Sequence, residues 1–162
     1  MDGFDLARIA LEYSRELAGS ARPALGPGER AFECVLRTDT YDVWLIHWGS
    51  GSGTPMHDHG RSAGVLSVID GALVERRPRR FRWGRLRQRV LRALEWQIMT
   101  PTHVHEIVNE SAEPATSVHV YSPPLEVMYH YEVSAGVAPR VIHRELIPQD
   151  APAGPTFART GH

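Results

Sequence analysis

Apolar and polar residues follow two different periods in two parts of the chain. Over residues 4–19 the apolar positions have the spacing of an amphipathic helix, which ends at Gly19. Residues 20–28 are rich in Pro and Gly, which is typical of a linker. Beyond them, short segments rich in Val, Ile, Trp, Tyr and Thr are broken by Gly and Pro. The pattern predicts one short N-terminal helix followed by a β-rich domain.

The predicted strands are short and lie near residues 31–37, 41–48, 55–59, 63–69, 72–77, 86–92, 95–99, 104–109, 116–121, 126–132 and 139–144. Because no second helical pattern interrupts them, they favour an antiparallel sandwich or barrel. A tail rich in Pro, Gly and Ala begins at residue 148 and is expected to be loosely held. We therefore expect an all-β protein, with helix and linker over 1–28, a single antiparallel β-barrel over 29–147 and the tail over 148–162.

Composition is that of a soluble globular protein. The chain has 162 residues, of which 42% are hydrophobic and 23% charged, and a formal net charge of -1. This balance gives no overall attraction to nucleic acid or to a membrane, and no apolar run approaches the roughly 20 residues of a membrane span. The single cysteine, Cys34, excludes an internal disulfide framework and is expected to be a small core residue. With no signal-peptide pattern, the expected location is the cytoplasm.

Half of the arginines fall between Arg76 and Arg92. Such a basic run can bind nucleic acid through phosphates. Arg85, Arg87 and Arg89, however, alternate with uncharged residues and so share one face of a strand, and few aromatic residues accompany them. We interpret the segment as a solvated hairpin. Contact of one of these arginines with an anionic substrate or a neighbouring subunit is the alternative.

The histidines include a candidate metal site. His57 and His59 form an H-x-H pair, and alternate residues of a strand face the same way, so both imidazoles could reach one ion. His105 lies in a further strand-like segment and is followed four residues later by Asn109, which suits a turn. His103 is a competing ligand two residues earlier. The offset to Asn109 favours His105 as the third ligand.

This spacing resembles the motifs of the cupin superfamily. The first motif, G-x5-H-x-H-x3–4-E-x6-G, is matched in register by residues 51–71, with Gly64 where the glutamate is usual. His105 and Asn109 match the end of the second motif. Without the glutamate, three histidines are left. That ligand set is found in the thiol dioxygenase branch of cupins.

Most of the predicted barrel is similar to the cysteine dioxygenase type I family of thiol dioxygenases. The similarity is clearest over residues 43–64 and 105–124, where Ser117, His119 and Tyr121 match a Ser-x-His-x-Tyr triad followed by Ser-Pro-Pro. It implies a cupin-type barrel of the double-stranded β-helix, or jelly-roll, kind. It also implies a non-haem metal-dependent enzyme.

The resemblance assigns the metal to His57, His59 and His105. Iron(II) is the implied metal and dioxygen the co-substrate, with nickel, cobalt or manganese as alternatives for imidazole ligands. Neutral imidazoles leave the charge of a divalent ion uncompensated, which favours a thiolate as a further ligand. The implied reaction oxidises a small thiol to a sulfinate, with further oxidation in a biosynthetic pathway as a variant. A non-catalytic binding module and a metal-dependent isomerase are the alternatives, and we expect a monomer or homodimer.

The candidate catalytic triad lies on one predicted strand. Ser117, His119 and Tyr121 alternate with Val118 and Val120, so the polar groups face one way and the valines the other. If the polar side is the interior, the serine orients the imidazole and the imidazole orients the tyrosine hydroxyl near the metal. The alternative is a buried hydrogen-bond network without a catalytic part.

The family resemblance also implies an arginine on an early strand that binds the substrate carboxylate. Reading back from His57 without gaps places Glu33 at that position, with Arg30 and Arg37 on either side and Arg61 as a further candidate. If Glu33 faces the pocket, a carboxylate would meet a like charge and an amine would be preferred. The thiol therefore stays open between cysteine, an aminothiol and a mercapto acid.

Overall fold

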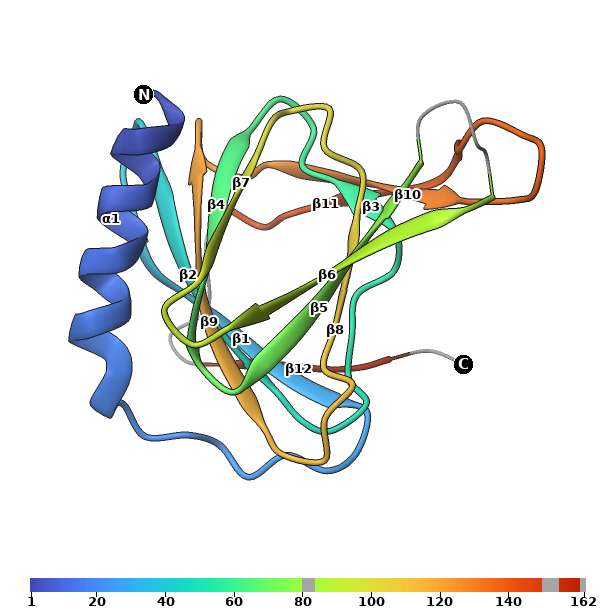
Figure 1. Ribbon diagram of the computed structural model, residues 1–162. Helices are drawn as coiled ribbons and strands as arrows, with labels where there is room; N and C mark the ends of the chain where they lie inside the picture. The colour runs from blue at the N-terminus through green and yellow to red at the C-terminus, as the bar shows by residue number, and fades with distance from the viewer. Residues whose placement is uncertain (80–83, 150–154, 161–162) are drawn as a thin grey trace.

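The computed structural model describes residues 1–79, 84–149 and 155–160. The chain begins with α1 (Gly3–Glu16) and the 3-10 turn η1 (Leu17–Gly19), which together cover the predicted helix (Figure 1). The described strands are β1 (Glu29–Arg37), β2 (Asp42–Trp48), β3 (His57–Asp58), β4 (Ala63–Asp70), β5 (Ala72–Pro78), β6 (Leu86–Arg92), β7 (Trp96–Met99), β8 (Glu106–Val108), β9 (Ala115–Ser122), β10 (Val127–Glu132), β11 (Arg140–Leu146) and β12 (Thr156–Arg159).

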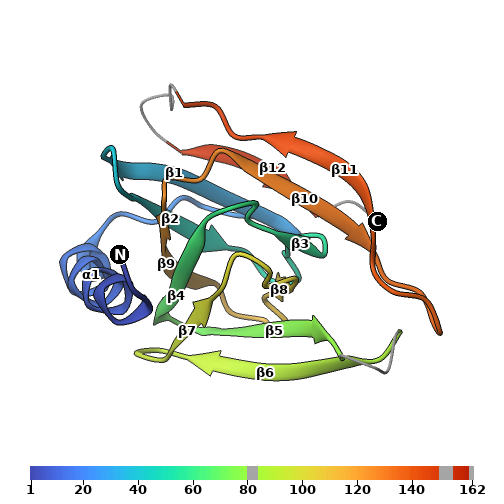
Figure 2. The same cartoon turned by 90° about the horizontal axis from the view of Figure 1, so that it is seen from above.

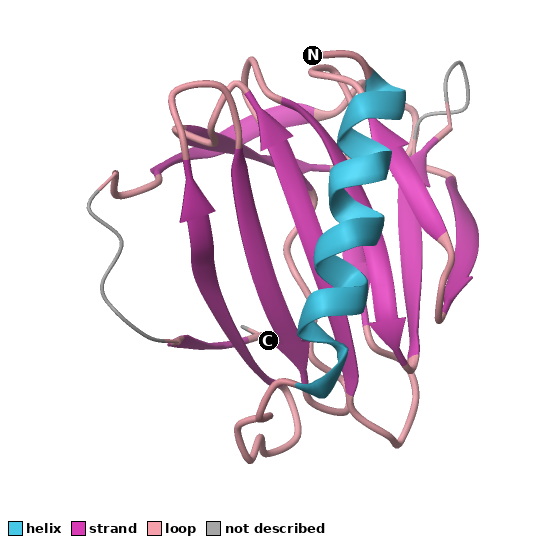
Figure 3. Ribbon diagram, turned by 90° about the vertical axis from the view of Figure 1, so that its left-hand side faces the viewer, coloured by secondary structure: helices cyan, strands magenta, loops and turns pink. Residues whose placement is uncertain are grey.

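The helix lies across the outer face of a large sheet (Figure 3). Asp2 caps it by accepting hydrogen bonds from the backbone N–H groups of Phe4 and Asp5, and the Asp5 side chain completes a capping box. Its buried face includes Leu6 and Ala10, which pack against apolar residues of the sheet. Within the described ranges, neither helical segment has the length and apolarity that a membrane crossing requires.

Two layers of strands enclose the interior. One is a six-stranded sheet in the order β12-β1-β2-β9-β4-β7. The other consists of two three-stranded sheets, β11-β10-β3 and β6-β5-β8, seen at opposite sides of the molecule from above (Figure 2). A bridge between His57 and His105 joins these two sheets through reciprocal backbone hydrogen bonds of 2.7 and 2.8 Å. The prediction of one N-terminal helix followed by an all-β domain is confirmed.

Two apolar cores lie on opposite faces of the large sheet. The outer core joins α1 to the sheet and contains Val118 and Val120 of β9. The inner core lies between the two layers and contains Trp48, Leu73 and Tyr121. The alternation predicted for β9 is therefore observed, and its polar side faces the interior. This places Ser117, His119 and Tyr121 inside the sandwich.

Part of the C-terminal tail is held more firmly than the composition predicts. Strand β12 pairs with β1 in antiparallel register, and Arg159 forms an ion pair with Glu29 at 2.5 Å. Thr156–Arg159 thus forms a paired strand, which the composition of the tail did not predict. Residues 150–154 lie outside the described ranges. Pairing with a strand more than a hundred residues earlier satisfies the backbone groups of this segment, a contact that composition does not reveal.

The arginine-rich segment forms the hairpin that the sequence predicts. Strands β5 and β6 pair without interruption, and Arg87 and Arg89 on β6 are exposed, as is Arg85 just before it. The tip at residues 80–83 lies outside the described ranges. The hairpin itself is therefore confirmed, and Arg77 differs from these exposed arginines in being half-buried.

Candidate metal centre

Three buried histidines meet between the two layers. One nitrogen from each of His57, His59 and His105 lies within 4.8 Å of the others, and their ring centroids are 4.9–5.1 Å apart. Their exposed fractions are 4%, 1% and 1%. The structure thus brings together the three residues predicted as metal ligands.

Local backbone contacts fix the H-x-H segment. His57 and His105 bond to each other through their main chains, which brings two distant segments side by side. The intervening Asp58 accepts hydrogen bonds from the Tyr131 hydroxyl at 2.6 Å and from the Gly60 N–H at 2.9 Å. Gly60 has a φ of 59°, a conformation that glycine adopts without strain. These contacts leave His57 and His59 facing inward.

Hydrogen bonding and burial prepare the imidazoles as metal ligands. His57 donates from Nδ1 to the Pro55 carbonyl at 2.8 Å, which leaves Nε2 as the free acceptor. Burial, followed by neighbouring imidazoles, holds the pKa of His57 and of His59 well below the usual value, so both are neutral. Both ring nitrogens of His59 and Nε2 of His105 have no hydrogen-bond partner among the described residues. Buried nitrogens without partners are costly, and a divalent metal ion would satisfy them.

Glu75 orients His105, a contact that the sequence analysis missed. Its Oε1 accepts hydrogen bonds from His103 Nε2 at 2.6 Å and from His105 Nδ1 at 2.9 Å, and all three side chains are buried. Burial opposes ionisation of Glu75, but the bonds from both imidazoles outweigh it and lower its pKa. The bond fixes the proton of His105 on Nδ1 and directs Nε2 toward the other ligands. An acidic residue at a core position of a predicted strand was the available signal.

His103 does not join the three-histidine group. It forms a second group of ligand-type atoms with Glu75 and His105, also within 4.8 Å, but hydrogen bonds already join these atoms. The competing ligand of the sequence analysis is thus a neighbour that helps to hold Glu75.

A directional chain of hydrogen bonds ends at Tyr121. Trp48 Nε1 donates to Ser117 Oγ at 2.9 Å, because an indole N–H can only donate. Ser117 Oγ lies 3.0 Å from His119 Nε2, and His119 Nδ1 lies 3.1 Å from the Tyr121 oxygen. If the Ser117 hydroxyl donates its hydrogen bond to His119 Nε2, then His119 Nδ1 carries the imidazole proton and donates to the Tyr121 oxygen. The Tyr121 hydrogen is then free to donate into the pocket.

The protonation states agree with this direction. Burial, followed by the charge of His105, lowers the pKa of His119 to about 3, so this imidazole is neutral. Burial raises the pKa of Tyr121, so its hydroxyl keeps its proton. The Tyr121 ring centroid lies 4.8 Å from that of His59, which places the tyrosine beside the metal ligands. The sequence analysis identified the triad but not the contribution of Trp48 to it.

Close packing explains the missing glutamate of the first motif. A Cβ at Gly64 would lie 2.7 Å from the Tyr121 ring and 2.9 Å from the Val120 carbonyl. Real Cβ contacts are not this short, so a side chain at this position would displace the tyrosine. Gly64 thus gives Tyr121 its place in the interior.

Glu33 faces away from the histidines. It lies opposite Leu45, which belongs to the outer core under α1, so the gap-free alignment does not place Glu33 in the pocket. A β-bulge between Cys34 and Leu36 shifts the pairing register of β1. An extra residue in a strand changes which face the preceding residues occupy, and counting along the sequence cannot detect it.

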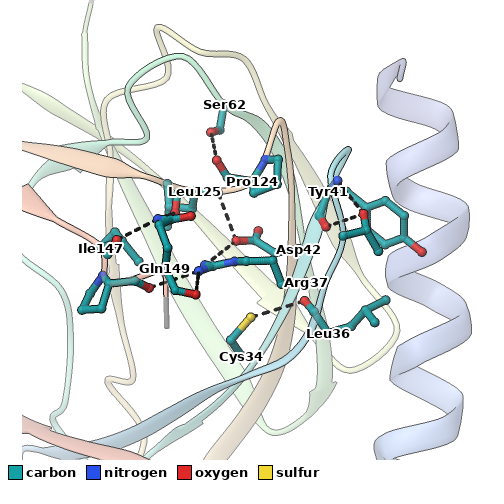
Figure 4. Close-up of polar contacts among 12 residues, drawn as sticks. Cys34, Leu36, Arg37, Tyr41, Asp42, Ser62, Pro124, Leu125, Ile147 and Gln149 are labelled. Carbon is teal, nitrogen blue, oxygen red and sulfur yellow. Dashed lines mark hydrogen bonds and ion pairs between the residues drawn. The ribbon is translucent and has the colours of Figure 1, made fainter. Parts of the chain in front are cut away.

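Arg37 is held by structural contacts. Its Nη2 bonds to Asp42 at 2.9 Å, and its Nη1 donates to the carbonyls of Pro148 and Gln149 at 3.1 and 2.9 Å (Figure 4). Asp42 is fully buried and also accepts from the Leu125 N–H at 3.0 Å. Arg37 therefore neutralises a buried carboxylate and ties the segment after β11 to β1 and β2.

The other two candidate arginines differ in their surroundings. Arg61 is 69% exposed and pairs with Glu126 at 3.0 Å, so it belongs to the surface. Arg30 lies opposite Trp48 and hence on the interior face of β1. Its Nη1 donates to the Gly53 carbonyl at 2.5 Å, and it has no carboxylate partner among the described residues. Arg30 is thus the one of the four predicted substrate residues that faces inward without a hydrogen bond or ion pair to a carboxylate among the described residues, although the charge of Glu145 raises its pKa.

Two further histidines lie next to His57 on neighbouring strands and form a row with it. His130 of β10 lies opposite His57, with ring centroids 6.2 Å apart, and opposite His143 of β11. His130 Nε2 is 2.7 Å from Glu145 Oε2. No sequence motif includes His130 or His143, because only the pairing between strands aligns them with His57.

Two facing layers of strands around a three-histidine group define a cupin fold with a candidate metal site. Solved structures with this fold include TT1209 from Thermus thermophilus, at a TM-score of 0.54 and 22% identity, covering 63% of this chain and 90% of that one. A Klebsiella pneumoniae protein with a double-stranded β-helix domain has a TM-score of 0.52 and 25% identity, covering 68% and 86%.

The sequence defines the family more narrowly. The model of the cysteine dioxygenase type I family matches residues 27–134, and the chain belongs to this family. Human cysteine dioxygenase type 1 is 29% identical over 106 residues, which is 59% of this chain and 52% of the human protein. The chain spans about half the length of the curated relatives it matches. The resemblance inferred from the motifs is confirmed.

Proposed function

We propose that the protein is a thiol dioxygenase that converts a small thiol and dioxygen into a sulfinic acid, R–SH + O₂ → R–SO₂H. The sulfur loses four electrons, both oxygen atoms end on it, and the product ionises to the sulfinate. The observation that carries this proposal is the set of buried histidine nitrogens without partners beside Tyr121. Membership of the cysteine dioxygenase family supports it.

His57, His59 and His105 are the residues that would hold the metal. Iron(II) bound there would supply open coordination positions and the redox chemistry that zinc lacks. The chain itself contributes neutral imidazoles, so the site favours an anionic thiolate. Glu75 keeps the His105 ring oriented through its Nδ1 proton.

The Tyr121 hydroxyl would donate a hydrogen bond to the reacting molecule. In the chain from Trp48 through Ser117, His119 donates to the Tyr121 oxygen, which leaves the tyrosine hydrogen available. His119 and Ser117 act through the tyrosine and are positioning residues.

The deciding experiment measures oxygen consumption by iron(II)-loaded protein with a panel of small thiols, and identifies the products by mass spectrometry. Thiol-dependent oxygen uptake with a product 32 mass units heavier than the thiol is the expected result. A binding module or an isomerase would consume no oxygen. Metal binding without oxygen uptake for any thiol would therefore refute the proposal.

Tyr121→Phe is expected to keep the metal but slow turnover by roughly 10- to 100-fold, because a positioned hydrogen bond worth about 1.5–3 kcal/mol is lost. Steady-state oxygen uptake and metal analysis of the purified variant provide the measurement. Tyr13→Phe on α1 is the matched control and should retain full activity. Unchanged kinetics in Tyr121→Phe would show that the triad has a purely structural role.

A further inference from the structure

The turn between β6 and β7 exposes a leucine in a backbone conformation that leucine rarely adopts. The Glu95 N–H donates to the Arg92 carbonyl at 2.9 Å and closes a four-residue turn, in which Leu94 is the third residue. Its φ is 71°, and no other non-glycine among the described residues has a positive φ. Such a turn favours Gly or Asn at this position, because they enter the left-handed region with little strain. The Leu94 side chain is 76% exposed, so burial within the chain does not offset the strain.

A hollow of about 460 Å³ lies beside Leu94. It is lined by Arg89 of β6, by Leu94 and Glu95 of the turn, and by Trp96, Gln97 and Ile98 of β7. The Arg89 guanidinium donates from Nη1 to Gln97 Oε1 at 2.7 Å, which links the two strands across the hollow. The hollow therefore has both apolar and charged walls.

The hollow follows an open sheet edge. Strand β7 ends the six-stranded sheet and β6 ends its three-stranded sheet, so each has one side that no described strand pairs. The turn lies at the edge of the molecule and close to α1 in both views (Figures 1 and 2). An open edge with exposed apolar side chains is a surface on which another chain can dock.

The apolar surface continues toward the start of α1. Gly3 lies against Ile98, because a Cβ on Gly3 would be 3.1 Å from Ile98 Cδ1. Met1 and Phe4, which are close to Gly3 in the chain, are both more than half exposed. Large exposed apolar residues therefore lie near both ends of β7.

The charges at this edge have no partners within one chain. No ion pair joins Arg89, Arg92 or Glu95 to another described side chain. Glu95 Oε2 accepts only the backbone N–H of Arg92, at 2.7 Å. A two-fold axis near the turn would bring the same surface of two copies face to face, so that Arg92 of one copy meets Glu95 of the other, twice. A purely acidic partner would be repelled by Glu95 and a purely basic one by the arginines, so the charges favour a second copy of this chain.

We infer that two copies of this chain associate through the β6–β7 turn, with the Leu94 side chain of each copy inserted into the hollow of the other. Arg92 of each copy pairs with Glu95 of the other around the two-fold axis. Burial of Leu94 in the partner offsets the strain of its backbone. None of the candidate metal ligands belongs to this interface, so association does not depend on thiol oxidation.

Analytical ultracentrifugation of the full chain at increasing concentration measures the association. The wild type should rise from the mass of one chain, 18.1 kDa, to twice that mass. Leu94→Asp should raise the dissociation constant of the dimer at least about 30-fold, as expected for an apolar residue at the centre of an interface. Leu146→Asp is the matched control, because Leu146 is an exposed leucine of β11 at a different sheet edge. It should leave the dissociation constant unchanged.

Two further changes separate association from folding. Leu94→Gly removes the side chain and suits the positive φ, so at a concentration where both proteins are monomeric it should melt no lower than the wild type. It should still lose the dimer. Arg92→Glu and Glu95→Arg should each weaken association, and the double variant should restore it, because the two charges are then exchanged.

A wild-type chain that stays monomeric at every concentration would overturn the inference. An unchanged dissociation constant in both Leu94 variants, or no recovery in the double charge variant, would do the same. Loss of the dimer in Leu146→Asp alone would place the interface at the β11 edge instead.

Discussion

Replacement of His57, His59 or His105 by alanine is expected to empty the metal site and abolish thiol-dependent oxygen uptake. The wild-type chain should bind about one divalent ion, held by three imidazoles. Two remaining imidazoles bind a divalent ion far more weakly, and the buried position excludes solvent ligands that could compensate. Metal content after dialysis should fall from about one to below about 0.1 per chain. Mass-spectrometric metal analysis and an oxygen electrode provide the two measurements.

His143→Ala is the matched control for the ligand variants. His143 is an exposed histidine on β11 at the end of the same row, and its loss should leave metal content unchanged. Full metal content in His105→Ala would contradict the assignment. It would indicate that Glu75 and His103, which form the second group of ligand-type atoms, bind the ion instead.

Periodicity predicted the fold well where one face of an element is buried. Strand β9 alternates between Val118 and Val120 under α1 and polar residues inside. The alternation predicted two distinct faces, and the structure shows that the polar face is the interior one. Strand β12 was missed, because its partner β1 is distant in sequence and its Pro- and Ala-rich surroundings resemble a free tail. Strand β3 has only two residues, too few for a periodic signal to define its ends.

The three candidate metal ligands could be predicted because His57 and His59 are two residues apart and because the motif around His105 resembles that of a known family. Glu75 and Trp48 could not, since each acts on a residue that is distant in sequence and reaches it only through strand pairing. Counting back from His57 could not show which face of β1 Glu33 occupies, because that depends on its pairing with Leu45 and on a bulge that the sequence does not reveal. Sequence therefore identifies groups that bind directly, while the residues that orient them depend on the three-dimensional pairing.

Glu75→Gln is expected to weaken metal binding about 10- to 100-fold with a smaller loss of stability. The carboxylate oxygen accepts two imidazole N–H groups, at 2.6 and 2.9 Å, in a buried site. The amide keeps the shape and one acceptor oxygen but removes the negative charge that strengthens both bonds. His105 then becomes a less basic and less firmly oriented ligand. Competition with a metal chelator measures the affinity, and thermal unfolding measures the stability.

Glu75→Leu removes the acceptor entirely. It separates the contribution of Glu75 to stability from its contribution to metal affinity. Both imidazole N–H groups would be left buried without a partner, at about 1–3 kcal/mol each, so the metal-free protein should lose about 2–6 kcal/mol of unfolding free energy. Glu126→Gln, a surface change of the same chemistry, should alter neither quantity. If Glu75→Gln binds metal as tightly as the wild type, orientation of His105 does not depend on the carboxylate charge. Its ring would then be fixed by the backbone bridge to His57 alone.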